Sequence, residues 1–409
     1  MAVIGSGVSG MSAAYLLQKK YDVTVFEAGD RLGGHVDTRP SATGRPVDQA
    51  FMVFSRTYYP TLTRLLGELD VQTHPADLST DVVCTSCGFR HLHDDPLGSQ
   101  NPPPHPESVD PHTWARFNDD HARFVPQLLQ ALEQSPEKTL GEFFRDNDYS
   151  DYFTLHYVFA RLTGWLLADV ENMPIQFLVN TLARYGFTGG PDAFASWHVI
   201  PEGARTYIER IAGTLTSINL ATPIRTVARS GEGIDLHDTA GNHHRFDKAV
   251  IAVHAPEALA MLANPTAADR AILGAFKYET LQTVLHTDGS ALPHHDGDSA
   301  IFMQVSCAKP RRSAVSFHAA LNKLRNQPSQ TPCYVTYNPV TAIDPKHVLA
   351  RTHYQHPSAT PESCQAQERL PELSDNVLAF AGTYHGDGFH EAGCHSGITA
   401  ATTLGAPWA

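Results

Sequence analysis

The chain of 409 residues is predicted to be an α/β protein whose nucleotide-binding domain is assembled from separate segments around an inserted α+β domain. Three observations predict this arrangement. A glycine-rich βαβ unit opens the chain, and short apolar runs typical of buried parallel strands return near residues 250 and 378. Helical and strand-rich blocks lie between them. The length is sufficient for two or three domains with their own cores.

The opening unit runs in the order strand, glycines, helix, strand and acid, which is the Rossmann-like pattern. Gly5 permits the tight turn, Gly7 lets the backbone approach a pyrophosphate, and Gly10 lets the helix pack closely on the strand. The helix N-terminus would face the phosphate charge. Glu27, 17 residues past Gly10, lies where an acid hydrogen-bonds a ribose hydroxyl. The sequence therefore predicts a dinucleotide site.

A second glycine pair decides between dinucleotides. Arg31 is followed by Gly33, Gly34 and His35, and this extension lets another stretch of backbone close over the pyrophosphate. NAD dehydrogenases usually lack the extension. It resembles that of the flavin amine oxidase and phytoene desaturase group, and this resemblance implies FAD. Glu27 argues against a 2′-phosphate and so against NADP. The alternative is an ordinary glycine-rich turn after the second strand.

The middle of the chain is predicted to hold the substrate domain. Leucine spacing predicts a helix over 61–69, and six prolines in 94–111 predict a surface loop. Residues 112–187 are expected to be largely helical, and their apolar stretch 152–167 lines either a substrate chamber or the interior of a helical cap.

The second half is expected to return to the nucleotide-binding domain. A hairpin over 231–241 and a buried strand over 246–253 precede a strand-rich block over 276–355, and the last strand leads to a helix from about Ser396. The predicted division is an FAD-binding domain of 1–90, 191–260 and 351–409, with a substrate domain made of a helical cap, 91–190, and a strand-rich part, 261–350.

Composition excludes some classes of protein. The net charge of −13 disfavours nucleic acid as a partner. There is no run of 18 apolar residues, and only Met1 precedes the first strand, so neither a transmembrane helix nor a signal peptide is expected. We expect a cytoplasmic protein with at most peripheral membrane contact.

Six cysteines offer one candidate metal cluster. Cys84 and Cys87 form a Cys-x-x-Cys pair, followed by His91 and His93. Against a metal, the segment alternates like a hairpin that turns near Gly88, and the second pair that makes zinc signals strong is missing. The sequence therefore predicts reduced, mostly buried cysteines and no metal.

Several motifs together resemble the flavin-containing amine oxidoreductase superfamily over nearly the whole chain, and so imply a fold of the amine oxidase and phytoene desaturase type. They are GSGVSG, FEAGDRLGGH, the 247–259 strand and turn, and the terminal AFAG and GFHEAGCHSGITAA. The chain is more closely similar to a bacterial subgroup of NAD/FAD-binding proteins associated with cyclopropane fatty acid synthases.

The resemblance implies a set of FAD contacts. Val227 resembles the residue whose backbone meets the adenine, and Gly382 and Thr383 resemble the terminal loop at the pyrophosphate and ribityl chain. The full expected set is Gly5, Ser6, Gly7, Gly10, Glu27, Arg31, Gly33, Gly34, His35, Val227, Gly382 and Thr383.

The sequence also departs from amine oxidases. Tyr384 stands where they commonly carry an acid, His35 where they often carry Arg, and Gln49-Ala50 where a Gly is expected. No lysine can be identified as the one beside flavin N5. An amine oxidase activity therefore does not follow from the fold.

Candidate catalytic residues lie mainly in the polar loop before the last helix. His390 can exchange a proton near neutrality, and Glu391 could orient it or hydrogen-bond the ribityl chain. Alternatively, both side chains satisfy backbone donors at the helix start. His286, with Asp288 nearby, is a further catalytic candidate in the substrate domain.

The sequence thus predicts an FAD-dependent oxidoreductase that removes hydride from a C–H bond of a small or lipid-like substrate, by desaturation, isomerisation or oxidation. O₂ or an unidentified acceptor would reoxidise the flavin. The alternatives are an amine or amino-acid oxidase and a flavin-binding protein without catalysis.

Overall fold

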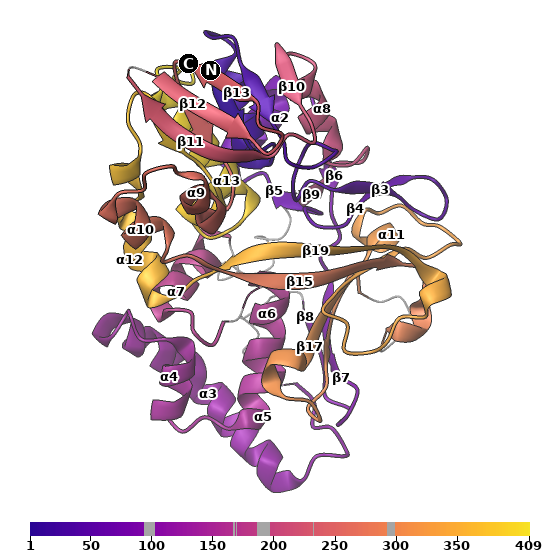
Figure 1. The fold of residues 1–409 in the computed structure, drawn as a ribbon. Coiled ribbons are helices and arrows are strands. Elements are labelled where there is room, and N and C mark those ends of the chain that lie inside the picture. Colours follow the sequence, from indigo (N-terminus) through magenta and orange to yellow (C-terminus); the bar gives the residue numbers. More distant parts are fainter. Residues whose placement is uncertain (94–102, 167, 169, 186–196, 232, 293–298) are drawn as a thin grey trace.

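The computed structural model describes the whole chain except residues 94–102, 167, 169, 186–196, 232 and 293–298. Two lobes are visible in Figure 1. One contains both termini, and the other contains the long strands β15 and β19 together with helices α3–α6.

The first lobe is built on a five-stranded parallel sheet in the order β10-β2-β1-β14-β20. Strands from the start, middle and end of the chain thus meet, as the sequence predicts. The five strands are β1 (Ala2–Ile4), β2 (Thr24–Phe26), β10 (Ser217–Asn219), β14 (Ala249–Ile251) and β20 (Leu378–Phe380).

The two faces of this sheet have different covers. Val3 and Val25 point to a core shared with α1 (Val8–Leu17) and α13 (His390–Thr403). Gly397 lets α13 approach α1, because a Cβ there would meet the backbone of Ser9. Helix α13 begins at His390, six residues before the predicted start.

On the other face, Ala2 and Ile4 pack beneath a small antiparallel sheet and a pair of helices. These elements are β11 (Ile224–Ser230), β12 (Gly233–Asp238), β13 (His243–Phe246), α9 (Ala255–Met261) and α10 (Ala267–Leu273).

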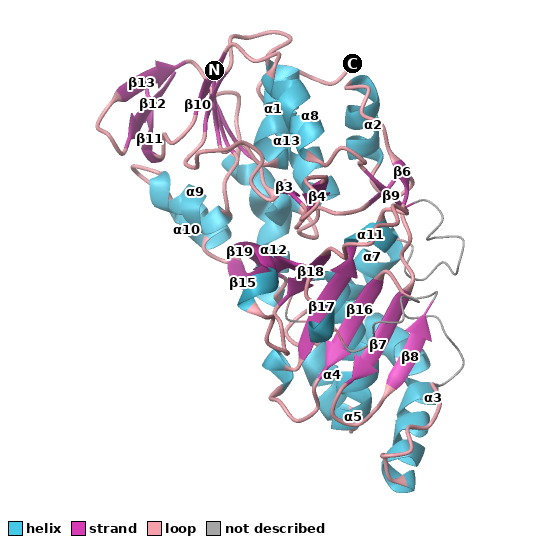
Figure 2. Ribbon diagram, turned by 90° about the vertical axis from the view of Figure 1, so that its right-hand side faces the viewer, coloured by secondary structure: helices cyan, strands magenta, loops and turns pink. Residues whose placement is uncertain are grey.

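The second lobe contains a seven-stranded sheet in the order β19-β15-β18-β17-β16-β7-β8, which Figure 2 shows with helices against one face. Its strands are β7 (Thr80–Cys84), β8 (Arg90–His93), β15 (Lys277–His286), β16 (Ile301–Val305), β17 (Val315–Ala320), β18 (Tyr334–Tyr337) and β19 (Val348–Ser358).

This sheet moves the expected domain boundaries. Strands β7 and β8 lie within segment 1–90 or at its end, and β19 begins before 351, yet all three pair in the second sheet. Strand β7 pairs in parallel with β16, and β19 pairs with β15 along nearly its whole length. These long-range backbone partners are invisible in the local pattern, so the second lobe includes residues that the predicted division assigns to the other domain.

The helical block predicted over 112–187 is present in its described part. Asp110 caps its first helix by accepting hydrogen bonds from the backbone N–H groups of His112 and Thr113, both at 3.0 Å. The helices are α3 (Pro111–Gln134), α4 (Leu140–Asp146), α5 (Asp151–Phe153), the π-helix η1 (Thr154–Phe159), α6 (Ala160–Leu166) and α7 (Ile175–Arg184). Much of the loop predicted over 94–111 lies outside the described residues.

Short helices and strands complete the two lobes. The helix predicted over 61–69 is α2 (Pro60–Glu68). The others are β3 (Thr38–Pro40), β4 (Pro46–Asp48), β5 (Phe54–Ser55), β6 (His74–Pro75), β9 (Trp197–Val199), α8 (Arg205–Ala212), α11 (Leu321–Leu324), α12 (Pro361–Arg369), η3 (Gly289–Ala291), η4 (Arg311–Ser313), η5 (Pro345–His347), η6 (Leu370–Leu373) and η7 (Thr383–His385).

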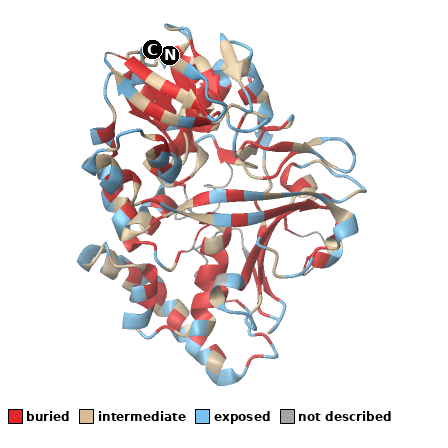
Figure 3. Ribbon diagram, in the orientation of Figure 1, coloured by how far each residue is buried: buried red, intermediate tan, exposed pale blue. Residues whose placement is uncertain are grey.

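Figure 3 shows buried residues in the strands of both sheets, with exposed residues alternating along β15 and β19 and frequent on the outer helices and turns. In the described part of the chain, no helix has both the length and the apolar character needed to cross a bilayer.

Candidate active site

A cavity of about 590 Å³ follows the carboxyl ends of the parallel strands in the first lobe, where α/β sheets bind their ligands. Eight of the twelve expected cofactor contacts line it: Gly5, Ser6, Gly7, Glu27, Gly34, His35, Gly382 and Thr383. Its volume lies within the range of small-molecule and cofactor sites.

The glycine-rich turn has the geometry that a diphosphate requires. Gly5 has φ +97°, and a Cβ at Gly10 would clash with the carbonyl oxygen of Gly5. At Gly7, by contrast, a Cβ would have no protein atom within 4 Å, so that position opens into the cavity. Helix α1 begins with Gly7 as its N-cap and has no side-chain cap. Its first N–H groups are therefore available to an anion.

Glu27 holds this turn in place. One carboxylate oxygen accepts hydrogen bonds from the Ser6 backbone N–H, at 3.0 Å, and from the Ser6 hydroxyl. The other accepts from the backbone N–H of Gly29 at 2.8 Å. Gly34 has φ +57° and lies against Gly7, since a Cβ on it would be 3.2 Å from the Gly7 Cα. The two glycine motifs thus meet at the cavity, and the residues present fit an FAD.

Three of the expected contacts stabilise the turns and do not line the cavity. A Cβ at Gly10 would clash with the carbonyl oxygen of Gly5, and a Cβ at Gly33 would clash with that of Val36, so both glycines allow close contacts between backbone segments. Arg31 donates to the carbonyl oxygens of Gly34 and Val36 at 2.8 and 3.0 Å, and it lies 3.3 Å from the Asp37 carboxylate. Arg31 therefore stabilises the second glycine turn through hydrogen bonds to its backbone.

The expected contact at Val227 needs correction. Its side chain is buried, and its carbonyl already accepts a hydrogen bond from Ala263 N–H at 2.9 Å. Ile224 and Arg225 line the cavity instead. They follow Pro223, which also lines the cavity and directly precedes β11. In the sequence, that proline marks where the strand begins.

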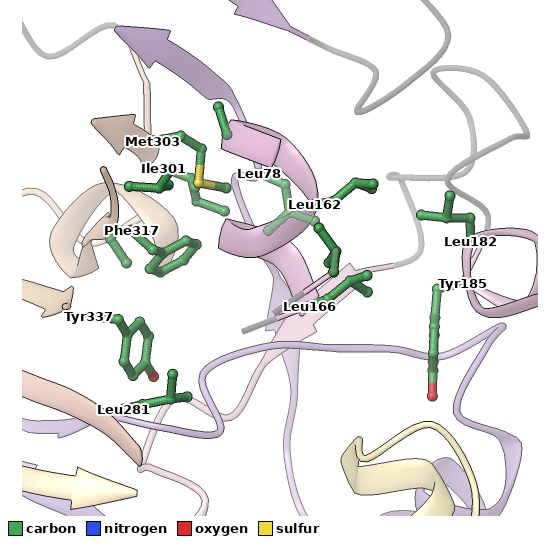
Figure 4. Close-up of a cluster of buried hydrophobic side chains, with 14 of the residues drawn as sticks. Leu78, Leu162, Leu166, Leu182, Tyr185, Leu281, Ile301, Met303, Phe317 and Tyr337 are labelled. Atoms are coloured by element: carbon green, nitrogen blue, oxygen red, sulfur yellow. The ribbon is translucent and has the colours of Figure 1, made fainter. Parts of the chain in front are cut away.

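A second cavity of about 140 Å³ lies between the lobes and forms an apolar chamber. His35, Gly388 and His390 line both the chamber and the dinucleotide cavity, so the two spaces adjoin there. Figure 4 shows part of the wall, with Phe317, Tyr337 and Leu281 on one side and Tyr185 on the other. Its other lining residues include Phe51, Met52, Tyr59, Trp165, Trp197, Ile301, Leu324, Tyr354 and His356.

A third cavity of about 360 Å³ continues from the chamber. Gly164, Leu281, Phe317 and Tyr337 line both. Unlike the chamber, this outer cavity is also lined by charged and polar side chains: Glu171, Glu279, Arg311 and Asn338. An elongated amphipathic molecule could therefore place its apolar part inside and its polar end outward.

His390 lies at the junction, as a catalytic candidate should. Its ring stacks on Phe51 with centroids 3.6 Å apart, and its Nε2 lies 3.2 Å from the Tyr207 hydroxyl. Burial, followed by the neighbouring His35, lowers the pKa of His390 to about 3. The expectation that it titrates near neutrality is thus corrected, because its imidazole stays neutral at ordinary pH.

Glu391 does not line these cavities and caps another helix. Its two carboxylate oxygens accept hydrogen bonds from the backbone N–H groups of Thr61 and Leu62, at 2.9 and 3.0 Å. These are first-turn donors of α2. The sequence left open a role at backbone donors at the start of the last helix; the structure instead uses Glu391 at the start of α2, which occupies both of its carboxylate oxygens.

His286 also lies apart from the site. Its Nε2 is 2.7 Å from the Thr336 hydroxyl, which in turn lies 2.8 Å from Nδ1 of His318. In the sheet register these residues alternate with Phe317 and Tyr337, which line the chamber. His286 therefore lies on the opposite face of the sheet, where burial lowers its pKa to about 4.

A polar network beside the chamber was not predicted from the sequence. Gln49 donates to Asp37 at 2.7 Å, and the Tyr354 hydroxyl donates to the same carboxylate at 2.8 Å. The only signal in the sequence is that Gln49 departs from an expected glycine. Because Tyr354 comes from β19, this network joins the two lobes.

Comparison with known proteins agrees with this architecture. Residues 8–300 match the model of a protein family described as flavin containing amine oxidoreductase. Polyamine oxidase 4 of Oryza sativa subsp. japonica is 26% identical over 263 residues, which are 61% of this chain and 50% of that protein. The chain thus spans about half the length of the curated relatives that it matches.

Solved structures share the fold over nearly the whole chain. A CLA-producing fatty acid isomerase from P. acnes has a TM-score of 0.68 at 15% identity, covering 98% of this chain and 97% of that one. Cyclohexylamine oxidase from Brevibacterium oxydans has a TM-score of 0.67 at 17% identity, covering 98% of both. The predicted α/β fold is confirmed.

Proposed function

The chain belongs to the flavin-containing amine oxidoreductase family, and on that premise we propose that it is an FAD-dependent oxidoreductase acting on a C–H bond of an apolar, lipid-like substrate. The FAD would lie along the dinucleotide cavity, and its reactive ring would reach the junction at His35, Gly388 and His390. When bound there, it supplies the hydride acceptor.

The observation that carries this proposal is the character of the chamber. None of its described lining residues is Asp, Glu, Lys or Arg, and aromatic and aliphatic side chains form its walls. Burying a charged group in such surroundings without a partner is strongly unfavourable. A neutral hydrocarbon segment, by contrast, gains about 0.8 kcal/mol for each buried CH₂.

The residues at the junction would position the substrate. His390 is neutral at ordinary pH, packs flat on Phe51 and lies beside the Tyr207 hydroxyl. A group with a pKa of about 3 is a weak base at neutrality. We therefore assign His390 the orientation of the reacting C–H bond rather than a proton transfer.

Two further features support a lipid. The outer cavity is lined by Asn338 and by Arg311, which also pairs with Asp151 and Glu171, and a polar headgroup would lie beside them. The resemblance to proteins associated with cyclopropane fatty acid synthases points to the same class. Contact with the edge of a membrane would then deliver the substrate, and O₂ or another acceptor would reoxidise the flavin.

A second candidate is an amine oxidase, and one observation favours it. Glu171 and Glu279 line the outer cavity, where they could attract the distal ammonium of a long amine whose reacting end is uncharged. The similarity to polyamine oxidase 4 and to cyclohexylamine oxidase is consistent with that candidate.

Ligand binding tests the choice. In holoprotein, fatty acids of increasing chain length should perturb the flavin spectrum with increasing affinity. Leu281→Asn should weaken this binding about tenfold or more, since it places an amide in the apolar wall, whereas the volume-matched Leu281→Met should retain it. If only long amines bind, and Glu279→Gln abolishes that binding, the amine candidate replaces the lipid.

A further inference from the structure

Three cysteines and one histidine meet in the second lobe, outside the lining of the cavities described above. The Sγ atoms of Cys84 and Cys307 are 3.6 Å apart, and Cys87 Sγ is 3.3 Å from Nε2 of His156. All four potential ligand atoms lie within 4.8 Å of one another. Residues far apart in the sequence thus direct sulfur and nitrogen atoms at one point.

The fold brings these residues together from three elements. Cys84 ends β7 and Cys87 lies in the turn to β8, where Gly88 has φ +70°. Cys307 follows β16, which pairs in parallel with β7 so that Val305 is the partner of Cys84. His156 comes from the π-helix η1, an element that frequently occurs at functional sites.

The histidine has the orientation of a metal ligand. Its Nδ1 lies 2.8 Å from the backbone carbonyl of Tyr152, so Nδ1–H donates to that oxygen. The lone pair of Nε2 is then directed at the cysteines. Metal-bound histidines commonly donate their other ring N–H to a carbonyl in this way. The Tyr152 hydroxyl, 3.4 Å from Cys87 Sγ, can donate to a thiolate there.

We propose that Cys84, Cys87, Cys307 and His156 bind one Zn²⁺ in a tetrahedral structural site. Zn–S bonds of about 2.3 Å place two sulfur ligands about 3.8 Å apart, close to the observed sulfur separation. Four protein ligands leave no open position for catalysis, so the ion would stabilise the fold. It would tie the β7–β8 hairpin to the helical cap and to the β16–β17 turn.

This proposal revises the expectation from sequence. The Cys-x-x-Cys pair is visible there, but the expected partners are His91 and His93, and no metal is expected. His91 instead contacts the buried Arg161 guanidinium, and the side chain of His93 lies outside what the structure describes. The proposed partners lie 69 and 220 residues beyond Cys87, outside the range of any local motif.

Metal analysis of untagged holoprotein, purified under reducing conditions, tests the site. We expect about one zinc per chain by mass spectrometry after passage over a chelating resin. Cys307→Ser should lose most of this zinc, and because Cys307 is exposed the variant should still fold and bind flavin. Cys364→Ser, a cysteine outside the cluster, is the matched control and should keep the metal.

Cobalt substitution checks the ligand set. Co²⁺ in this site should give the visible bands of a tetrahedral thiolate centre, at longer wavelengths than oxidised flavin, and these bands should weaken in His156→Asn. The proposal is overturned if reduced protein takes up neither metal, or if zinc persists unchanged in Cys307→Ser. A Cys84–Cys307 disulfide in protein purified anaerobically would also overturn it.

Discussion

Gly7 and Gly10 belong to one turn, but their missing side chains serve different purposes. A Cβ at Gly10 would meet the backbone of Gly5, whereas one at Gly7 would meet no protein atom. We therefore expect Gly7→Val to fold normally and to lose FAD, because its side chain would occupy the place of the pyrophosphate.

Absorbance of the purified protein and its thermal unfolding check this expectation. Gly7→Val should be colourless, with an unfolding temperature close to that of wild-type apoprotein. Gly10→Ala is the matched control and should destabilise the apoprotein itself. A yellow Gly7→Val protein with normal FAD content would show that the diphosphate does not bind at this turn.

His390 tests whether the junction orients substrate or moves a proton. His390→Ala should slow flavin reduction about 10²-fold, the scale expected from misplacing a reacting group, while FAD content stays near that of wild type. His390→Phe keeps the stacking on Phe51 and loses the contact with Tyr207, so it should be intermediate.

The pH dependence of reduction separates the two roles. Burial lowers the pKa of His390 to about 3, so its titration should not change the rate of reduction near the ordinary histidine pKa of about 6.5. The pH profiles of wild type and His390→Ala should therefore have the same shape in that range. A limb of the wild-type profile that is lost in His390→Ala would identify His390 as a proton carrier whose pKa rises when cofactor and substrate are bound.

Among the elements, α2 shows how the terminal helix stabilises its neighbour. Glu391 accepts from two backbone N–H groups at the start of α2. Its removal should cost about 2 kcal/mol of the free energy of unfolding, since it leaves two backbone donors without their charged acceptor. Urea unfolding of Glu391→Ala measures this loss, and flavin reduction by a saturating substrate should be unchanged. A normal stability with a large loss of reduction rate would restore Glu391 to the catalytic machinery.

Elements with local signals were predictable from sequence, and those defined by distant partners were not. The opening βαβ unit, α2 and the β7–β8 hairpin follow from glycines, leucine spacing and alternation. The sheet that receives β7 and β19 depends on pairing with β16 and β15, which no local pattern reveals.

The candidate site divides in the same way. The glycines and Glu27 were predictable because their spacing is itself the motif. The chamber was not, because its walls come from segments between His35 and His390 that meet only in the fold. The contact expected at Val227 lies too far along β11, since the first residues of that strand, Ile224 and Arg225, line the cavity. The composition of a strand is easier to recognise in a sequence than the residue at which the strand begins.

At the scale of the whole molecule, buried histidines should make stability depend on pH. Burial lowers the pKa of His35, His91, His286, His318, His356, His385 and His390 to about 3 or 4. In the unfolded chain they titrate near a pKa of about 6.5. Below that pH the unfolded chain binds more protons, so the stability that these histidines contribute is present above about pH 6.5 and is lost as pH falls.

The expected size of this effect is large. At about pH 5.5 each such histidine lowers the free energy of unfolding by about 1.4 kcal/mol. Several of them together are comparable with the whole free energy of unfolding of a typical domain, about 5–15 kcal/mol. The unfolding temperature should fall steeply between about pH 7 and pH 5.5. His318→Gln should flatten that slope, whereas the exposed His74→Gln should leave it unchanged. An unfolding temperature that is constant over this range would contradict the assignment of neutral buried imidazoles.

We propose that the flavin cavity and the adjoining uncharged chamber together oxidise an apolar substrate. Anaerobic photometry of the bound flavin, mixed separately with fatty acids, phospholipids, amines and amino acids, tests this proposal. We predict bleaching by an acyl-chain substrate, with no bleaching by amines or amino acids. Bleaching by amines alone would contradict the lipid substrate, and a flavin that no member of the four classes reduces would contradict catalysis at this site.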